Sequence, residues 1–365
     1  MKTQTNENPD KRGLGSSFNT LAISGTLPKI SNPSKDEITV MGYGTDLGNI
    51  SALEGRAKRK LITQTMALYL IQIAREDEDW IWEQRFSNTF LCQNELKTAG
   101  GRSYTIYCKN RCCQICLAIR KAEKVNLYLP TLEAMPNPQF LTLTAQSVSK
   151  DGLRQRVLDT AHAMRTIIAR HKKRNQRGRE EKFSGIWSLE SNFNGVAKTY
   201  NPHIHVITAT EYQAETIMND WMQYWKDRSV YIVREAQYYR PAKQDLEKDL
   251  IETVKYGSKI FTEPDIAKRI KFGLPKKPSF IYVRALYNIL QAMDGIDIFS
   301  TYGIELKCTI KRPKKSTILK EYEDWNYDLA APDWINEDLG LRLAKYNVPE
   351  ELEALLTSRV NKDFE

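Results

Sequence analysis

Apolar residues recur at helical spacing in several stretches of the chain, where they fall three or four positions apart. Ser149 precedes one of these stretches, and serine is a preferred residue immediately before a helix. We therefore predict helices over residues 58–75, 116–129, 151–174, 211–228 and 243–260.

Four other runs have the composition of β-strands, with β-branched and aromatic residues bounded by turn-forming residues. Asn194 and Gly195 separate the second run from the third, which predicts a hairpin. The order strand, helix, hairpin, helix, strand, helix predicts an α+β fold in which helices pack against an antiparallel sheet. The predicted strands cover residues 138–146, 185–193, 199–209 and 229–239.

Composition divides the chain into four predicted regions. Residues 1–57 are rich in Ser, Thr, Asn, Gly and Pro and lack periodicity, which predicts a flexible arm. Residues 58–130 combine helical patterns with most of the cysteines, and residues 131–315 contain the predicted sheet and a C-terminal extension. Residues 316–365 form an acidic segment with short helical patterns.

The net charge of +9 is unevenly distributed. From Glu321 to Glu365 there are 12 acidic and 4 basic residues, so this segment carries −8 and the rest of the chain +17. A basic body favours a polyanionic partner, although a charge run by itself is more often a solvated surface. The densest basic run supplies the candidate DNA-binding residues Lys172, Lys173, Arg174, Arg177 and Arg179.

No run approaches the roughly 18 apolar residues that a membrane helix needs, and the N-terminus, MKTQTNENPDKRG, is too polar for a signal peptide. We therefore expect a cytoplasmic protein without a membrane partner. Six cysteines in such a protein argue against a disulfide scaffold. Five of the six fall between positions 92 and 116.

These cysteines have the spacing of a metal site. Cys92, Cys108, Cys113 and Cys116 form a C-x15-C-x4-C-x2-C series, and tetrahedral zinc prefers the terminal C-x-x-C. Cys112 could replace Cys113, and a small core of reduced thiols is the alternative to a metal site. Four thiolates leave no open coordination position, so this zinc would be structural.

His203 and His205 stand one residue apart in the strand run NPHIHVITAT. Alternate side chains of a strand share a face, so the two imidazoles make half of a metal site. Glu190, on the other arm of the predicted hairpin, is the candidate third ligand of a Mg²⁺ or Mn²⁺ ion with open water positions. The alternative is that all three are surface residues of an edge strand.

The last predicted helix has a polar face opposite its apolar face of Leu246, Leu250, Ile251 and Val254. Glu252 lies one helical turn before Tyr256, so both side chains can serve the same reacting centre. A phenol that attacks a phosphate, a carboxylate that handles protons or water and lysines that offset charge suit the cutting and rejoining of DNA strands. The polar face consists of Glu252, Lys255, Tyr256 and Lys259.

The chain resembles the HUH endonucleases, specifically the replication initiator (Rep) proteins of small bacterial plasmids that replicate by a rolling circle. Three motifs match in order: FLTLT (140–144), NPHIHVI (201–207) and ETVKYGSK (252–259). The upstream CKNRCCQIC (108–116) resembles the C-x-x-R-x-C-x-x-C element of the same proteins, which selects Cys113 over Cys112. A departure is Asn201, where many relatives carry a further histidine.

The resemblance implies an HUH-type antiparallel sheet with packed helices, preceded by a small four-cysteine zinc module. It implies that His203 and His205 bind the divalent metal and that Tyr256 attacks the phosphate at the nick site. Glu252 would activate water for the terminating cleavage, and Lys259 would contact the phosphate or the metal shell.

The expected substrate is plasmid origin DNA, which must be presented unpaired as a single strand or an extruded hairpin. Lys255 joins the candidate DNA-binding residues, and a host helicase and a second copy of the chain are candidate partners. Two alternatives stay open: an HUH transposase or relaxase with the same chemistry, and a non-catalytic, zinc-stabilised DNA-binding regulator.

Overall fold

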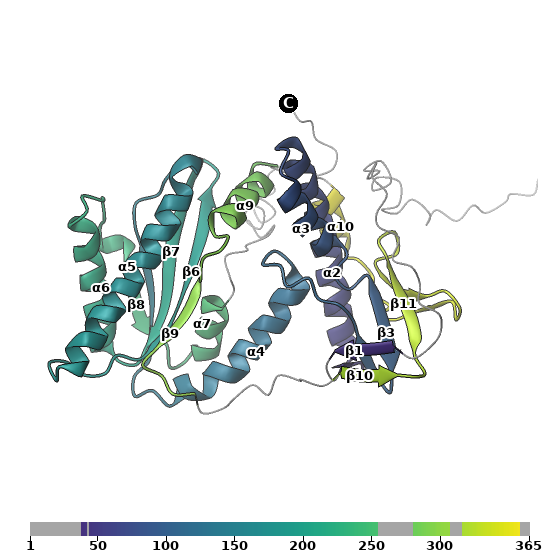
Figure 1. Cartoon of the computed structure of the whole chain (residues 1–365), viewed down its shortest axis with the longest axis horizontal. Helices are drawn as coiled ribbons and strands as arrows, with labels where there is room; N and C mark the ends of the chain where they lie inside the picture. The colour runs from purple at the N-terminus through teal and green to yellow at the C-terminus, as the bar shows by residue number, and fades with distance from the viewer. Residues whose placement is uncertain (1–37, 42–43, 255–279, 307–315, 358–365) are drawn as a thin grey trace, which may run out of the picture. The chain divides into compact units, whose positions relative to one another are not determined.

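The computed structural model describes residues 38–41, 44–254, 280–306 and 316–357 (Figure 1). Its backbone contacts divide the chain into two compact units, and each unit is made of segments that are distant in the sequence. The first unit comprises residues 1–115, 268–280 and 312–365, and the second comprises residues 116–267 and 281–311.

Two packed helices, α2 (Ile50–Glu76) and α3 (Trp80–Phe90), form the helical part of the first unit. Asn49 caps α2, because its side-chain oxygen accepts a hydrogen bond from the N–H of Ala52. The helix therefore begins before Lys58, where the apolar periodicity predicts its start. Residues 1–37 of the predicted arm lie outside the described residues.

A six-stranded sheet completes the first unit, in the order β13-β12-β11-β3-β4-β2, and β1 forms a separate pair with β10. All of these pairs are antiparallel. The strands are β1 (Ile38–Met41), β2 (Thr45–Asp46), β3 (Glu95–Ala99), β4 (Arg102–Tyr104), β10 (Ser316–Leu319), β11 (Glu323–Asp328), β12 (Asp333–Asn336) and β13 (Leu341–Arg342).

The acidic C-terminal segment thus contributes strands β10 to β13, where the sequence predicts short helical patterns. One short helix, α10 (Glu350–Thr357), follows these strands. Trp334 is fully buried, and its Nε1–H donates a hydrogen bond of 2.7 Å to the carbonyl of Gln93. The segment therefore belongs to the core of the first unit. The predicted four-region division of the chain stays a prediction.

The second unit contains a five-stranded antiparallel sheet in the order β8-β5-β7-β6-β9. The predicted α+β class with antiparallel sheets is confirmed. The predicted strand over 229–239 is wrong in extent, because a 3₁₀ turn at Arg234–Ala236 precedes a strand of only four residues. The strands are β5 (Gln139–Thr144), β6 (Gly185–Asn194), β7 (Thr199–Thr208), β8 (Tyr238–Pro241) and β9 (Phe299–Tyr302).

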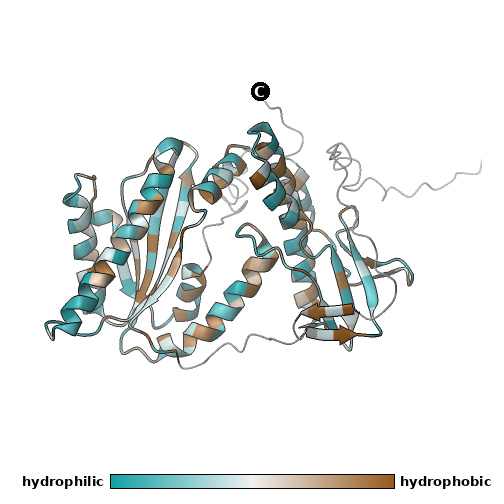
Figure 2. Ribbon diagram, in the orientation of Figure 1, coloured by the Kyte–Doolittle hydropathy of each residue, from teal (hydrophilic) through white to brown (hydrophobic). Residues whose placement is uncertain are grey.

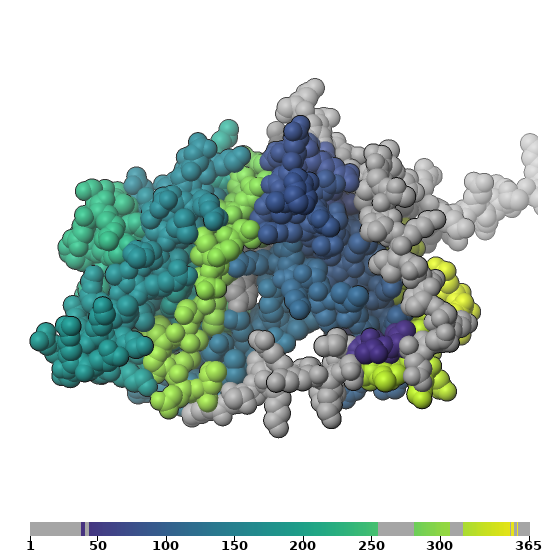
Figure 3. Space-filling model, viewed as in Figure 1, coloured from purple at the N-terminus to yellow at the C-terminus, as the bar shows by residue number. Residues whose placement is uncertain are grey.

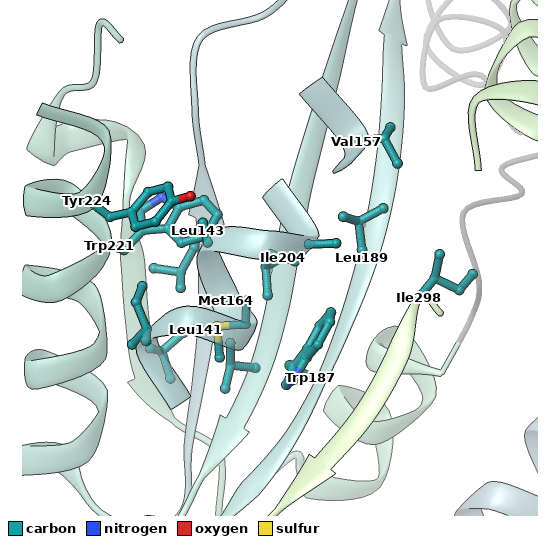
Figure 4. Packing of buried hydrophobic residues seen from close by; sticks show 14 of the residues in the cluster. Leu141, Leu143, Val157, Met164, Trp187, Leu189, Ile204, Trp221, Tyr224 and Ile298 are labelled. Carbon is teal, nitrogen blue, oxygen red and sulfur yellow. The ribbon is translucent and has the colours of Figure 1, made fainter. Parts of the chain in front are cut away.

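The helices α5 (Lys150–Gln176), α6 (Glu211–Lys226) and α9 (Phe280–Ala292) cover one face of this sheet. Their apolar sides pack on the strand residues that point to this face, including Leu189 and Ile204 (Figure 4). Figure 2 shows hydrophobic and hydrophilic residues alternating along α5, as the spacing in the sequence predicts.

On the opposite face, α4 (Gln114–Glu133) and α7 (Leu246–Thr253) pack on a smaller apolar cluster. Leu246 and Leu250 of α7 and Val254, directly after it, are in this cluster, and all three belong to the apolar face predicted from the helical wheel. The strand residues in the cluster include Phe140 and Ile207. Because side chains alternate along a strand, this is the face to which His203 and His205 also point.

Candidate metal centres

The predicted hairpin brings Glu190, His203 and His205 together, and we call these three residues the triad. Glu190 on β6 lies directly opposite His203 on β7, and all three donor atoms lie within 4.8 Å of one another. The side chains are almost completely buried, with exposed fractions of 2%, 4% and 7%. The sequence does not determine the pairing register of β6 and β7. The register in the structure places the carboxylate beside both imidazoles.

Two hydrogen bonds orient the imidazole rings of the triad. The Nδ1 atom of His203 lies 2.9 Å from the carbonyl oxygen of Asn201, and that of His205 lies 3.2 Å from the hydroxyl of Thr142. A carbonyl can only accept, so Nδ1 of His203 carries the proton and its Nε2 keeps a lone pair. Second-shell partners of this kind are typical of histidines that ligate metals.

The Nε2 atoms of both rings point toward the carboxylate of Glu190. The Nε2 atoms of His203 and His205 lie 3.9 and 3.8 Å from Oε2 of Glu190. These distances are too long for hydrogen bonds, but two bonds of about 2.0–2.2 Å from a central ion can span them. A buried carboxylate and two imidazoles thus form a donor set that fits a divalent cation.

Helix α7, which ends before the candidate nucleophile in the sequence, packs on the same face of the sheet as the triad. A paired Arg240 and Asp249 fasten α7 to β8, with N···O distances of 2.9 and 2.5 Å. Glu252 is half-exposed near the end of α7. Tyr256, Lys255 and Lys259 lie outside the described residues, so their distances from the triad stay a prediction.

The basic run lies on the other side of the sheet. Its candidate DNA-binding residues are exposed at the end of α5 and in the following turn, and α5 covers the face opposite the triad; α5 forms part of the surface seen in Figure 3. His171 is buried within this run, where Nδ1 lies 2.8 Å from Oε2 of Glu180. The structure does not bring this run to the triad. The exposed candidate DNA-binding residues of this run are Lys172, Lys173, Arg174, Arg177 and Arg179.

The four predicted cysteine ligands also converge. The Sγ atoms of these cysteines lie within 4.8 Å of one another, and sulfurs bound to one zinc ion at about 2.3 Å would be about 3.8 Å apart. The N–H of Cys108 lies 3.4 Å from Sγ of Cys92, a donor that stabilises a thiolate. Cys112 does not belong to the group. The four members are Cys92, Cys108, Cys113 and Cys116.

A fully buried lysine, Lys60 on α2, stands beside the cysteine cluster. Its Nζ donates to the carbonyls of Phe90 and Cys92 at 2.8 and 2.7 Å, and to Oδ1 of Asn94 at 2.7 Å. The pKa of Lys60 is lowered to about 7, because the effect of burial exceeds the opposing effect of the nearby cysteine charges. The three hydrogen bonds of Nζ therefore hold the loop around Cys92.

Sequence reasoning misses the residues that orient the ligands. Lys60 stands within an ordinary helical pattern, and only the packing of α2 shows that it is buried. Thr142 lies in the quoted motif FLTLT, so the motif marks its position without assigning a role to its hydroxyl. Asn201 contributes its backbone carbonyl to the histidine pair, which no side-chain pattern could indicate.

The fold and the donor atoms define an α+β protein with two groups of residues suited to metal ions. In the part of the chain that the structure describes, no helix has both the length and the apolar character needed to cross a membrane. No protein-family model matches the chain, and no solved structure matches it significantly.

A curated relative gives the family. "Protein rep" from Staphylococcus aureus is 30% identical to this chain over 165 residues, which cover 42% of this chain and 69% of that protein. The chain therefore belongs to the Rep protein family.

Proposed function

We propose that this protein nicks one strand of plasmid origin DNA at a specific site and rejoins it, and so initiates rolling-circle replication. Membership of the Rep family supports a role in replication. The observation that carries the proposal is the convergence of Glu190, His203 and His205 on the sheet face against which α7 packs. An HUH-type fold and a cytoplasmic location are parts of the same proposal.

The triad would hold a Mg²⁺ or Mn²⁺ ion, which supplies Lewis acidity toward a non-bridging oxygen of the scissile phosphate. Glu190 would contribute a negatively charged oxygen donor, and the two imidazoles would contribute neutral nitrogen donors. Three protein ligands therefore suit a catalytic site better than a structural one.

Tyr256 would be the nucleophile. Its oxygen forms a bond to phosphorus while the bond from phosphorus to the 3′ oxygen breaks, so the phenol loses a proton and the 3′ oxygen leaves as a hydroxyl. The protein stays joined to the 5′ end through a phosphotyrosine that conserves the energy of the phosphodiester bond. Lys255 and Lys259 would offset phosphate charge, and Glu252 would activate water for the terminating cleavage.

The cysteine cluster would hold a structural zinc ion. Four thiolates would fill a tetrahedral shell and would leave no position for water or substrate. The helix α4 starts at the cluster, and the partial positive charge at a helix N-terminus favours the thiolate form.

A covalent-capture experiment tests the proposed function. Overlapping single strands from the DNA around the gene would be 5′- or 3′-labelled and incubated with the protein and Mn²⁺. We expect the protein to become covalently joined to the 5′ end that cleavage creates. A chelator should abolish this adduct. Tyr256→Phe should abolish it too, because the substitution removes only the attacking oxygen. Tyr212→Phe, on the exposed surface of α6, is the matched control and should form the adduct normally.

If no strand yields an adduct although DNA binding is retained, the non-catalytic regulator becomes the better account. An adduct that Tyr256→Phe still forms would remove Tyr256 from the mechanism. A joining assay on transposon ends or a transfer origin separates the replication initiator from a transposase or relaxase.

A further inference from the structure

The triad needs a neighbouring surface that holds DNA, and the exposed basic run on α5 lies on the other face of the sheet. The edge strand β8 offers such a surface. Directly opposite residues of an antiparallel sheet share a face, and Tyr238 on β8 lies opposite Thr142, which lies opposite His205. Tyr238 therefore stands in the same cross-strand row as His205, two strands away, which is about 10 Å.

The ring of Tyr238 is available for contact, because 55% of this residue is exposed. Its neighbour Tyr239 points to the opposite face, where it packs against the larger apolar core. Tyr238 thus places an aromatic surface beside the triad without a role in the core of the sheet.

A cationic side chain is anchored to the backbone of the residue before Tyr238. Arg234 is exposed on the 3₁₀ turn before β8, and its Nη1 donates to the carbonyl of Gln237 at 3.2 Å. A guanidinium has five N–H donors, so this hydrogen bond leaves others able to bind a phosphate. Glu235, the next residue, points about 120° away around the turn.

A buried amide fixes this turn to the sheet. The Oε1 atom of Gln237 accepts a hydrogen bond of 2.8 Å from the N–H of Thr144, and its Nε2 donates to the carbonyl of Val233 at 3.1 Å. Thr144 lies directly opposite His203. Tyr238 pairs with Thr142, and Gln237 holds the turn with Arg234 to Thr144. Both elements are therefore fixed to the β5 residues that lie opposite the histidines.

We infer that Tyr238 and Arg234 form a docking rim for the single-stranded DNA that enters the triad, an inference that rests on the proposed function. Tyr238 stacks on a base that flanks the scissile phosphate, and Arg234 binds a neighbouring phosphate. An aromatic ring stacks on a base only when the base is unpaired, so the rim favours single strands over duplex. Strand β8 has four residues and lies at the edge of the sheet, with no strand paired to its outer side among the described residues.

Equilibrium binding without cleavage tests the rim. The full chain would be titrated, without added Mg²⁺ or Mn²⁺, into fluorescently labelled oligothymidylate of about 15 nucleotides, which lacks the nick site, and fluorescence anisotropy would be recorded. We expect Tyr238→Ala to raise the Kd about five- to a hundredfold through the loss of one stacking contact, while Tyr238→Phe changes it by less than about twofold. Arg234→Ala should raise the Kd and reduce the slope of log Kd against log salt by about 1, as expected for the loss of one phosphate contact.

Tyr212→Ala is the matched control, because Tyr212 is also 55% exposed but lies on α6, which covers the other face. It should bind like the unmodified chain. The rim is ruled out if Tyr238→Ala binds within about twofold of the unmodified chain, or if Tyr212→Ala weakens binding equally. The assay involves no cleavage, so a failed adduct experiment leaves this result unaffected, and a failed rim leaves the Tyr256 adduct intact.

Discussion

The two candidate metal centres differ in how completely the protein surrounds an ion. The cysteine cluster offers four sulfur donors from a loop, a turn and the start of a helix, whereas the triad offers one oxygen and two nitrogens from adjacent strands. Four soft donors fill a tetrahedral site, and three hard or borderline donors leave positions open. Ligand number and chemistry therefore separate a site that holds structure from a site that can act on a phosphate.

The surroundings of the two centres differ in the same way. At the cysteine cluster a buried amine, Lys60, lies close to the donors, and the charges of Cys92, Cys113 and Cys108 favour its protonated form. At the triad two neutral groups contact the imidazoles, namely the hydroxyl of Thr142 and the carbonyl of Asn201. Neutral partners orient the imidazoles without competing with a substrate phosphate for the cation.

The largest effect should follow from the loss of one thiolate. If four ligands share the roughly 10–16 kcal/mol of a structural zinc site, Cys113→Ser costs about 3 kcal/mol, or about a hundredfold in zinc affinity. We expect this variant to lose bound zinc, measured by mass spectrometry, and to unfold at a lower temperature. Cys112→Ser, a change at the adjacent buried cysteine outside the group, should keep both properties. Equal loss in both variants would mean that the cysteines only pack in a core.

The sequence predicts the larger elements of the second unit well and the strands of the first unit poorly. Long apolar periodicities predict α5 and α6, and Asn194 with Gly195 predicts the hairpin of β6 and β7. Strands such as β3 and β12 are short and mix polar with apolar residues, so neither a continuous run nor a clear alternation marks them. Strand β3 pairs with β11 from the acidic segment, far along the chain, and β12 pairs with β11 and β13 within that segment.

The candidate ligands are predictable because each has a distinctive chemistry and spacing, as His203 and His205 show. The position of Glu190 opposite His203 depends on the register of the hairpin, which the length of the turn sets. The docking rim at Tyr238 was not predicted, because the sequence indicates one long strand where the structure has a turn and a short edge strand.

Removing the histidine donors of the triad should change the unfolding temperature less than the loss of a thiolate does, but it should greatly reduce adduct formation. His203→Gln with His205→Gln retains polar side chains of similar size, so we expect a modest change in unfolding temperature and near-normal binding of single-stranded DNA. The Mn²⁺-dependent adduct should fall by at least about a hundredfold, because the ion supplies several kcal/mol of stabilisation to the transition state. Mn²⁺ should also cease to raise the unfolding temperature. His162→Gln, an exposed histidine on α5, is the control, and an unchanged adduct in the double variant would place the metal elsewhere.

The smallest effect should come from the hydroxyl that orients His205. Thr142→Val preserves the shape of the side chain and removes the 3.2 Å contact with Nδ1, so the ring loses one constraint on its tautomer and orientation. Partners of this kind typically contribute 10- to 100-fold to metal affinity. We expect the Mn²⁺ concentration for half-maximal adduct formation to rise by about that factor, while the rate at saturating Mn²⁺ stays near normal. Ser188→Ala is the matched control, since Ser188 lies opposite His205 on the other flanking strand and its Oγ makes no hydrogen bond within the described structure. If both variants shift the Mn²⁺ dependence equally, a change in packing next to His205 explains the effect. The hydroxyl of Thr142 would then not orient the ligand.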